Sequence, residues 1–190
     1  MEYLGEIFWI ILLLLFLIPP IQRRLLSAAR MRMIRKIEKE RDSRVIALIH
    51  REEKLKLLGI PLFRFIDIHD SEDVLRAIRL TDDEVPIDFI LHTPGGLAIA
   101  SLQIARALKN HPAPTRVIIP HYAMSGGSLL ALAADEIIMD PNAVLGPVDP
   151  QIQGMPGASI VRLLRRKSIN RVSDKMIVYA DLAEKAQAQL

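Results

Sequence analysis

The sequence contains no cysteine among its 190 residues. This absence excludes a disulfide framework, a zinc site with thiolate ligands and a cysteine nucleophile. The positive and negative charges nearly balance. The formal net charge is only +3, which excludes a polybasic protein that binds nucleic acid. Hydrophobic residues make up 51% of the chain, which excludes a disordered protein. We therefore expect one folded domain with an appendage, and no nucleic-acid partner.

Glycine-rich loops that bind nucleotide phosphates are missing too. The two glycine turns, TPGG at 93–96 and MSGG at 124–127, match neither the spacing of a P-loop nor that of a dinucleotide fingerprint. The sequence therefore implies no organic cofactor, and it implies no metal.

One long hydrophobic run is present, at the N-terminus. Residues 7–18 (IFWIILLLLFLI) are all apolar, and further apolar side chains extend the run on both sides. A helix needs about 20 residues to cross a bilayer core, so residues 1–21 predict a transmembrane anchor. Pro19 and Pro20 are expected to end this helix, because proline lacks the N–H group that a continuing helix needs. A buried core helix and an uncleaved targeting leader are the alternatives.

Basic residues follow the apolar run. Between residues 23 and 44, nine lysine and arginine side chains stand against three acidic ones. By the positive-inside rule this asymmetry predicts a single-pass protein of the cell membrane whose C-terminal bulk is cytoplasmic. A cleaved signal peptide would carry its positive charge before the apolar run. We interpret residues 22–44 as a basic juxtamembrane helix that contacts anionic lipid headgroups, or as a solvated linker or partner-binding helix.

Residues 45–190 show a different pattern, in which short apolar runs alternate with helical stretches. Strands that alternate with helices predict an α/β domain with a parallel sheet. The helix at 70–80 is expected to begin with Asp70 or Ser71, and the proline- and glycine-rich stretch after Asp140 is expected to be a loop. The expected strands are 45–50, 63–68, 86–93, 115–122 and 136–140, and the expected helices are 70–80, 97–109, 128–134, 159–167 and 173–190.

The two glycine turns fall where the third and fourth expected strands end. In parallel α/β sheets, functional groups gather at the carboxyl ends of strands, where loops lead into helices. The N–H groups at a helix start are unpaired and carry a partial positive charge, so both turns can donate to an oxyanion. Ser125 lies beside these donors, in a turn that can expose a nucleophile. Each turn alone also fits a simpler role, because Ser125 can be a helix N-cap and PGG is a common tight turn.

The segments HTPGG (92–96) and AMSGGSLLALAADEIIMDPNAVLGPVDPQ (123–151) together resemble motifs of the serine peptidases of the Clp protease and crotonase-like fold. The resemblance is closest to signal peptide peptidase A and to the membrane-anchored serine dehydrogenase proteinases, and it covers residues 45–190. The LGPVDPQ element (145–151) points to the latter subfamily. No dinucleotide fingerprint supports a dehydrogenase.

This resemblance implies an α/β fold of repeated β-β-α units, preceded by one N-terminal transmembrane helix. It also implies a homo-oligomer and a membrane-bound serine endopeptidase, which hydrolyses membrane-associated or misfolded polypeptides through an acyl-enzyme. Related chains generally continue with more helix, whereas the last helical pattern here runs to Leu190 without a stop signal. We therefore expect the domain to be C-terminally truncated.

The resemblance also implies roles for single residues. Ser125 matches the nucleophile of these peptidases, Gly126 matches one backbone donor of the oxyanion hole, and Gly96 matches the other. This agrees with the position of the two turns, because a tetrahedral intermediate needs donors placed where its negative charge develops.

The general base is harder to assign. A Clp-type histidine belongs after Ser125, but all five histidines precede it: His50, His69, His92, His111 and His121. Signal peptide peptidases use a serine and a lysine, so we expect a Ser-Lys enzyme whose base is Lys185, with Lys175 as the alternative. Glu184 and Asp181 beside Lys185 are equally consistent with an ordinary surface lysine. Lys167 lies in a charged run, RRKS, that is typical of a solvated surface. Asp149 can orient a base or cap the following turn.

Two other functions stay open. One is a catalytically silent scaffold or partner-binding membrane protein on the same fold, which the lack of an unequivocal base favours. The other is acyl-CoA chemistry, with the glycine turns as an oxyanion hole for a thioester. The serine between strand and helix, and the predicted anchor, count against acyl-CoA chemistry.

Overall fold

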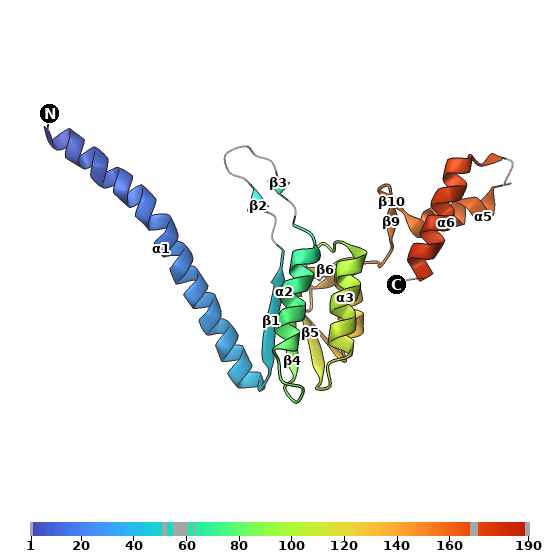
Figure 1. Cartoon of the computed structure of the whole chain (residues 1–190), viewed down its shortest axis with the longest axis horizontal. Helices are drawn as coiled ribbons and strands as arrows, with labels where there is room; N and C mark the ends of the chain where they lie inside the picture. Colours follow the sequence, from blue (N-terminus) through green and yellow to red (C-terminus); the bar gives the residue numbers. More distant parts are fainter. Residues whose placement is uncertain (1, 51–52, 55–60, 63, 168–170, 189–190) are drawn as a thin grey trace. The chain divides into compact units, whose positions relative to one another are not determined.

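The structure is a computed structural model that describes residues 2–50, 53–54, 61–62, 64–167 and 171–188. The chain divides into two compact units, Met1–Val45 and Ile46–Leu190. Figure 1 shows the helices and strands and labels most of them as they are named below.

The first unit is dominated by one helix, α1 (Glu2–Arg41), which contains both Pro19 and Pro20. The predicted helix end at these prolines is therefore wrong. Proline has a fixed φ that is compatible with a helix, and its cost is a lost hydrogen bond and a bend rather than an obligatory stop. The helix ends instead at Arg41, and the next residue, Asp42, has a φ of 48°, which lies in the left-handed region.

The apolar N-terminal run lies within α1. In the part of the chain that the structure describes, no helix is both long enough and apolar enough to cross a membrane. The transmembrane helix predicted for residues 1–21 is therefore not supported by the structure.

The second unit contains a four-stranded sheet in the order β1 (Arg44–Ile49), β4 (Ile87–His92), β5 (Thr115–Ile119), β7 (Glu136–Met139). The pairs β4–β5 and β5–β7 are both parallel. Three helices accompany the sheet, α2 (Ile68–Arg79), α3 (Ala98–Lys109) and α4 (Gly126–Ala133). In Figure 1, α2 and α3 lie side by side in front of the sheet. This architecture confirms the predicted α/β class and the parallel sheet.

The core lies between the central strands and these helices. Fully buried apolar side chains come from β4, β5, α3 and α4: Phe89, Leu91, Val117, Ile119, Ile104 and Leu130. Strand β4 is almost continuously buried, as expected for a central strand of a parallel sheet. The packed core fixes where these strands end, and hence where the loops after them begin.

The strand predicted at 63–68 is wrong for its described part. Ile66 forms only an isolated parallel bridge with Gly96, and helix α2 already begins at Ile68. Its N-cap is Asp67 rather than Asp70 or Ser71. The Asp67 carboxylate accepts the Asp70 N–H at 2.9 Å, and the Asp70 carboxylate accepts the Asp67 N–H at 3.0 Å. This reciprocal capping box fixes the start of the helix, because it satisfies two otherwise unpaired donors. Phe63 lies outside the described residues.

The strand predicted at 115–122 is divided at Pro120. After β5, a short strand β6 (Tyr122–Ala123) pairs in parallel with β8 (Val144–Leu145). The order β5–β6–α4 is one β-β-α unit of the kind expected. Proline suits this break because it cannot donate to a sheet ladder.

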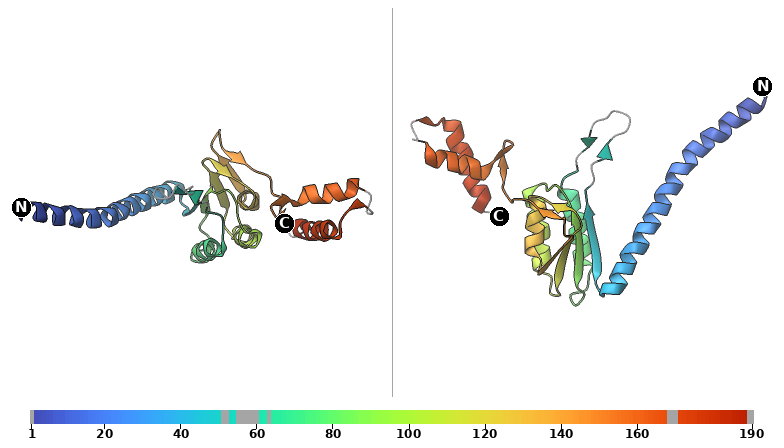
Figure 2. Two further views of the ribbon diagram at one scale, coloured as in Figure 1. Left: turned by 90° about the horizontal axis from the view of Figure 1, so that it is seen from above. Right: turned by 180° about the vertical axis from the view of Figure 1, so that it is seen from behind.

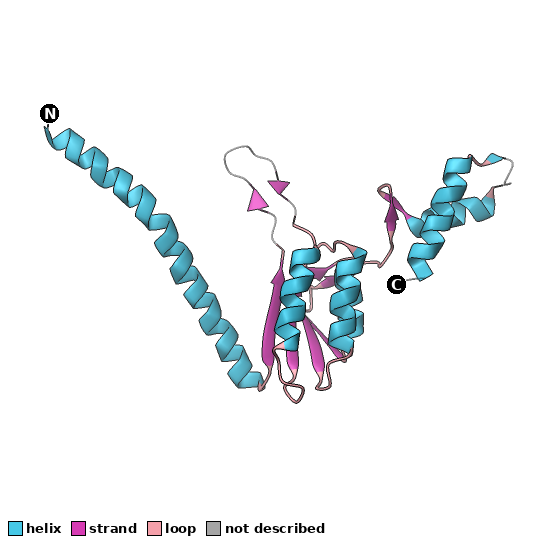
Figure 3. Ribbon diagram, viewed as in Figure 1, coloured by secondary structure: helices cyan, strands magenta, loops and turns pink. Residues whose placement is uncertain are grey.

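Short hairpins and a helix pair complete the second unit (Figures 2 and 3). The hairpins are β2 (Glu53–Lys54) with β3 (Pro61–Leu62), and β9 (Gln151–Ile152) with β10 (Met155–Pro156), the latter within the expected loop. Helices α5 (Gly157–Arg166) and α6 (Asp174–Ala188) pack against each other, near the ranges predicted for them.

Candidate active site

The PGG turn after β4 and the SGG turn after β6 lie against each other. Backbone hydrogen bonds join the two chains directly before the turns: Thr93 N–H donates to Tyr122 C=O at 3.2 Å, and Met124 N–H donates to Thr93 C=O at 3.0 Å. The structure therefore brings the two turns together at one edge of the sheet, where helices α3 and α4 begin.

Glycine is required where the turns touch. Gly95 has a φ of +104°, and a Cβ atom added to it would stand 2.8 Å from the carbonyl oxygen of Met124. On the opposite turn, a Cβ atom at Gly126 would collide with Oγ of Ser101, and one at Gly127 would stand 2.6 Å from Cγ2 of Thr93. Backbone approaches this close are the physical reason for glycine in both motifs.

Ser125 has a strained backbone. Its φ of 51° and ψ of −116° lie outside the regions that residues with a Cβ atom normally occupy. It stands at the N-cap position of α4, but its side chain forms no capping hydrogen bond. A capping serine normally has an extended backbone, so the simple cap interpretation does not account for this geometry. A strained serine on a sharp turn between strand and helix is typical of a nucleophile, because the turn exposes its hydroxyl.

The predicted oxyanion donors, Gly96 and Gly126, lie next to Ser125. Among the described residues, neither backbone N–H donates a hydrogen bond. The nitrogen of Gly96 is 3.7 Å from the position that a Cβ atom of Gly126 would take. Two unused donors from separate turns therefore lie close to one hydroxyl, which is the arrangement that can stabilise a developing oxyanion.

A cleft of about 460 Å³ opens over this arrangement. Its volume is within the usual range for ligand sites. Ser125, Gly96 and Gly126 line it together with mainly apolar side chains: Phe65, Leu97, Leu129, Val148 and Ile152. The cleft can therefore hold an extended, partly apolar ligand against the serine.

The structure does not bring the predicted lysines to the serine. Lys185 is exposed, and its Nζ lies 2.7 Å from a carboxylate oxygen of Asp181 one helical turn earlier. Lys175 places its Nζ 5.5 Å from the centre of the Tyr179 ring. In the described part of the chain, no hydrogen bond joins either lysine to Ser125. However, Ala186, which follows Lys185, lines the cleft.

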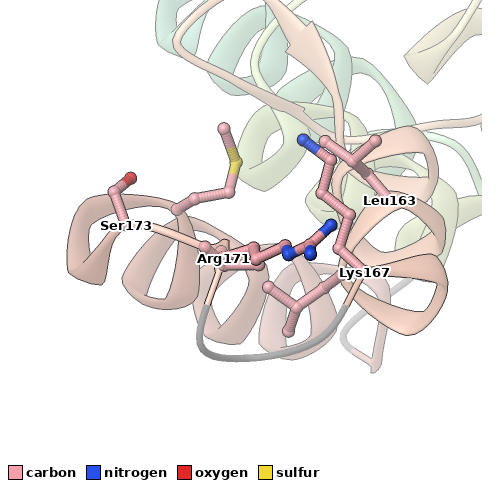
Figure 4. Close-up of a pocket in the computed structure, with 7 residues that line it drawn as sticks. Leu163, Lys167, Arg171 and Ser173 are labelled. Atoms are coloured by element: carbon pink, nitrogen blue, oxygen red, sulfur yellow. The ribbon is translucent and has the colours of Figure 1, made fainter.

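Lys167 belongs to a different cavity (Figure 4). This cavity measures about 280 Å³ and lies on the helix pair α5–α6, where Leu163, Arg171, Ser173 and Met176 also line it. The position of Lys167 does not link it to the serine.

The histidines have other partners. His121 is exposed and stacks on His92, with ring centres 5.6 Å apart, and both rings contact Tyr122. His111 Nε2 lies 2.8 Å from the Val85 carbonyl oxygen, and His69 lies 4.0 Å from Glu72. Within the described residues, none of these rings forms a hydrogen bond with Ser125.

Asp149 caps a helix. Its Oδ1 accepts the N–H of Ala158, in the first turn of α5, at 3.1 Å. Of the two roles left open for Asp149, the structure shows the capping one, although the residue also lines the cleft.

Three polar side chains behind the turns, those of His50, Thr93 and Asp70, were not assigned to the site from the sequence. His50 Nδ1 lies 2.8 Å from Oγ1 of Thr93, and its Nε2 lies 3.2 Å from Oδ2 of Asp70. A signal was available for His50, because it directly follows β1 at the edge of the sheet where functional groups gather. No sequence pattern predicts its partner Asp70, which belongs to α2.

Ser128 is a further residue of the site that the sequence motifs did not predict. Its buried hydroxyl lies 2.9 Å from the Ala123 carbonyl oxygen and 2.7 Å from the Gly146 carbonyl oxygen. The SGG turn is thereby tied to the LGPVDPQ segment, which forms one wall of the cleft.

No metal site emerges from the residues that the structure describes. They contain no group of three histidine, aspartate or glutamate side chains arranged to hold an ion.

Comparison with known proteins places this arrangement in context. The family model of the ClpP-like SDH-type serine proteinases matches residues 1–190. Two proteins of Methanocaldococcus jannaschii are similar: the uncharacterized protein MJ1495 is 57% identical over 190 residues, and the uncharacterized protein MJ0137 is 53% identical over 184 residues. These matches cover 100% and 97% of this chain but 65% and 64% of the relatives, so the chain spans slightly less than two thirds of their length.

Among solved structures, transcarboxylase 12S with methylmalonyl-coenzyme A and methylmalonic acid bound is similar at 17% sequence identity. The match covers 77% of this chain and 28% of that one, with a TM-score of 0.42.

Proposed function

Because the chain belongs to the ClpP-like SDH-type serine proteinases, we propose that it is a serine endopeptidase that cleaves polypeptides through an acyl-enzyme. The observation that carries the proposal is the strained backbone of Ser125 beside the unused N–H groups of Gly96 and Gly126. Strain at a single non-glycine residue persists only where the surrounding structure enforces it, and it is concentrated at functional sites.

In the proposed reaction, the Ser125 oxygen attacks a peptide carbonyl held in the cleft. The carbonyl oxygen becomes an anion, which accepts hydrogen bonds from Gly96 N–H and Gly126 N–H. Each such donor typically contributes about 3 to 4 kcal/mol of transition-state stabilisation. The C–N bond then breaks, the amine leaves with a proton, and water hydrolyses the acyl-serine.

A base must remove the proton of the Ser125 hydroxyl and later deliver it to the leaving amine. We propose Lys185 for this role, with Lys175 as the alternative. The support for Lys185 is its position beside Ala186, which lines the cleft. Its Nζ would have to leave Asp181, which costs little because an exposed ion pair contributes at most about 1 kcal/mol.

The proposed substrates are membrane-associated or misfolded polypeptides. The mainly apolar lining of the cleft supports a preference for hydrophobic segments. A membrane anchor over residues 1–21, a cytoplasmic catalytic domain and a homo-oligomer complete the proposal. The anchor and its orientation rest on the apolar run and the basic residues after it, and the oligomer rests on the family resemblance.

One observation favours a second candidate, a catalytically silent scaffold on the same fold. In the described residues, no lysine or histidine forms a hydrogen bond with Ser125. Such a protein would keep the cleft for binding a polypeptide without cleaving it.

Reaction with a fluorophosphonate probe separates the two candidates, because this probe requires an activated serine rather than a bound ligand. The full chain is purified in detergent and treated with the probe, with Ser125→Ala as the matched control. The peptidase requires labelling of the wild type and none of Ser125→Ala. Labelling that persists in Ser125→Ala, or its absence from an assembled wild-type protein, would contradict the peptidase.

A further inference from the structure

A chain of polar contacts leads from Asp70 of α2, whose side chain is 27% exposed, to the buried PGG turn. The Asp70 carboxylate lies 3.2 Å from His50 Nε2, and His50 Nδ1 lies 2.8 Å from Thr93 Oγ1. The same Thr93 oxygen accepts the N–H of Gly95 at 3.1 Å. The His50 side chain is 5% exposed, and Thr93 is fully buried. The chain therefore ends inside the protein, one residue before the proposed oxyanion donor Gly96.

The tautomer of His50 sets the direction of its bond with Thr93. A carboxylate can only accept, so we assign the ring proton to His50 Nε2, which faces Asp70 at 3.2 Å. Nδ1 of this neutral tautomer then accepts the hydroxyl proton of Thr93. A lone pair of Thr93 Oγ1 remains for the Gly95 N–H, and the Gly95 carbonyl oxygen, at 3.4 Å, is a more distant acceptor for the same hydroxyl. In this arrangement Thr93 Oγ1 joins His50 to the Gly95 N–H.

The Thr93 hydroxyl binds the N–H of Gly95, and the backbone of Ile66 binds the C=O of Gly95. The Gly95 carbonyl oxygen accepts the N–H of Ile66 at 2.8 Å. In a trans peptide group the C=O and N–H bonds point in opposite directions, so the N–H of Gly96 points away from Ile66. Gly96 also lines the cleft together with Ser125. Anchoring Gly95 at both its N–H and its C=O therefore sets the direction of the Gly96 N–H.

Asp70, His50 and Thr93 have the bonding pattern of a catalytic triad, but Thr93 cannot act as its nucleophile. Its side chain is fully buried, it does not line the cleft, and its oxygen already accepts the N–H of Gly95. The site that would receive a substrate belongs to Ser125. The pattern is therefore suited to holding a backbone group in place, not to attacking a substrate.

We propose that Asp70, His50 and Thr93 are positioning residues, which aim the Gly96 N–H at the oxyanion formed at Ser125. This role rests on the proposed peptidase function. Loss of the Thr93 hydroxyl is expected to lower kcat, with little change in KM, because the oxyanion develops only in the transition state. A misplacement of about 1 Å can reduce a rate about 100-fold, so we expect a decrease of roughly 10- to 100-fold.

The test compares Thr93→Val with Thr93→Ser in the full chain. Thr93→Val keeps the methyl group that packs beside Gly127 but removes the hydroxyl, whereas Thr93→Ser keeps the hydroxyl. The rate of fluorophosphonate labelling and the kcat and KM for fluorescent casein are measured. We expect the loss in Thr93→Val and near wild-type values in Thr93→Ser. Equal rates in Thr93→Val and wild type would overturn the proposal.

Two further variants separate positioning from stability. His50→Gln interrupts the contacts between Asp70 and Thr93 at a second point, so it replaces Thr93→Val in the test if Thr93→Val does not fold. Thr81→Val removes the hydrogen bond from the Thr81 hydroxyl to the Ala77 carbonyl oxygen (2.9 Å) at the other end of α2, and it leaves Asp70, His50 and Thr93 unaltered. We expect His50→Gln to lower kcat and Thr81→Val to lower only the melting temperature. If Thr81→Val lowers kcat as much as His50→Gln does, the effect is structural and the proposal fails.

Hydrogen exchange separates this proposal from the peptidase function itself. In Thr93→Val the amide proton of Gly95 loses its acceptor and is expected to exchange at least about tenfold faster, while the amides of β5 keep their protection. If the wild type neither reacts with the probe nor cleaves casein, the peptidase function has failed, and the role of Thr93 in holding Gly95 is judged on this exchange alone. Unchanged exchange at Gly95 would show that the contacts from Asp70 through His50 to Thr93 do not hold the PGG turn.

Discussion

Gly95 and Ser125 are packed so closely that a Cβ atom at Gly95 would stand 2.9 Å from the Cβ of Ser125. Non-bonded contacts of a Cβ atom shorter than 3.0 Å are essentially never found in proteins. The turn that carries Gly96 and the turn that carries the serine are therefore a single packed unit.

The first prediction concerns Gly95→Ala. The added methyl group meets the Ser125 turn, and the φ of +104° is unfavourable for alanine, so we expect the free energy of unfolding to fall by about 3 kcal/mol or more. Labelling by the fluorophosphonate probe should disappear. Gly154→Ala is the matched control, because Gly154 also has a positive φ (+75°) but nothing lies within 4 Å of its Cβ position. Its cost should be only about 1 to 2 kcal/mol, and equal losses in the two variants would contradict the close packing.

The second prediction separates strain from chemistry at position 125. Ser125→Gly and Ser125→Ala both remove the hydroxyl, but only glycine accepts the φ of 51° without strain. We expect Ser125→Gly to be more stable than Ser125→Ala by about 1 kcal/mol in denaturant unfolding, and neither variant to react with the probe. A Ser125→Ala variant that is the more stable of the two would show that the backbone is not strained.

The third prediction concerns the base. Lys185→Ala is expected to reduce casein hydrolysis by at least about 100-fold, with a change in stability below about 0.5 kcal/mol, because the Lys185–Asp181 pair is exposed. Asp181→Asn is the control, since it breaks the same pair and keeps the lysine. If Lys175→Ala abolishes hydrolysis and Lys185→Ala does not, the base is Lys175. If both variants retain full activity, the Ser-Lys mechanism is wrong.

The fourth prediction is a pH dependence at the start of α2. The hydrogen bond from the Asp70 N–H holds the pKa of the Asp67 carboxyl below its ordinary value of 3.8. A lowered pKa in the folded state means that the charged carboxylate stabilises the fold above about pH 4, and that this stabilisation is lost as the pH falls through the folded-state pKa. We therefore expect thermal melts of wild type and Asp67→Asn to differ at pH 7 and to approach each other as the pH falls below 3.8 and through the folded-state pKa. A difference that is constant over this range would exclude the charge effect.

The fifth prediction concerns the N-terminal helix. If residues 1–21 anchor the chain, the full protein should sediment with membranes and need detergent for extraction, whereas a chain without these residues should stay in the supernatant. Two arginines in the apolar run, Leu13→Arg and Leu14→Arg, should weaken membrane insertion, because each charge costs about 3 kcal/mol at a bilayer centre. Sedimentation that is unchanged in both variants would exclude this anchor. Digestion of the C-terminal domain by protease added to intact cells would reverse the proposed orientation.

The sequence allowed the α/β class and most helices to be predicted, because periodic apolar patterns report local structure and burial. The PGG and SGG turns could be assigned to strand ends for the same reason, since β4 and the β5–β6 segment have clear patterns before them. The start of α2 was harder to predict, because Asp67, Asp70 and Ser71 are all suitable caps. The capping box between Asp67 and Asp70 decides among them only once the backbone is in place.

The contacts among Asp70, His50 and Thr93 behind the two glycine turns could not be predicted from the sequence. His50 and Asp70 belong to different elements, and their contact depends on β1 lying next to β4 in the sheet. Long-range strand order and side-chain partners of this kind are not encoded in any local pattern.

Thr93 gives this region a stereochemical requirement. Its methyl group occupies the space beside Gly127, while its hydroxyl bonds with His50 and Gly95. These two substituents sit on one carbon, so their places are set by the handedness of that carbon. The diastereomer allo-threonine has the same atoms and the same volume, yet with an unchanged backbone it would exchange the positions of methyl and hydroxyl. The fit of the two glycine turns therefore depends on the chirality of a side chain as well as on its composition.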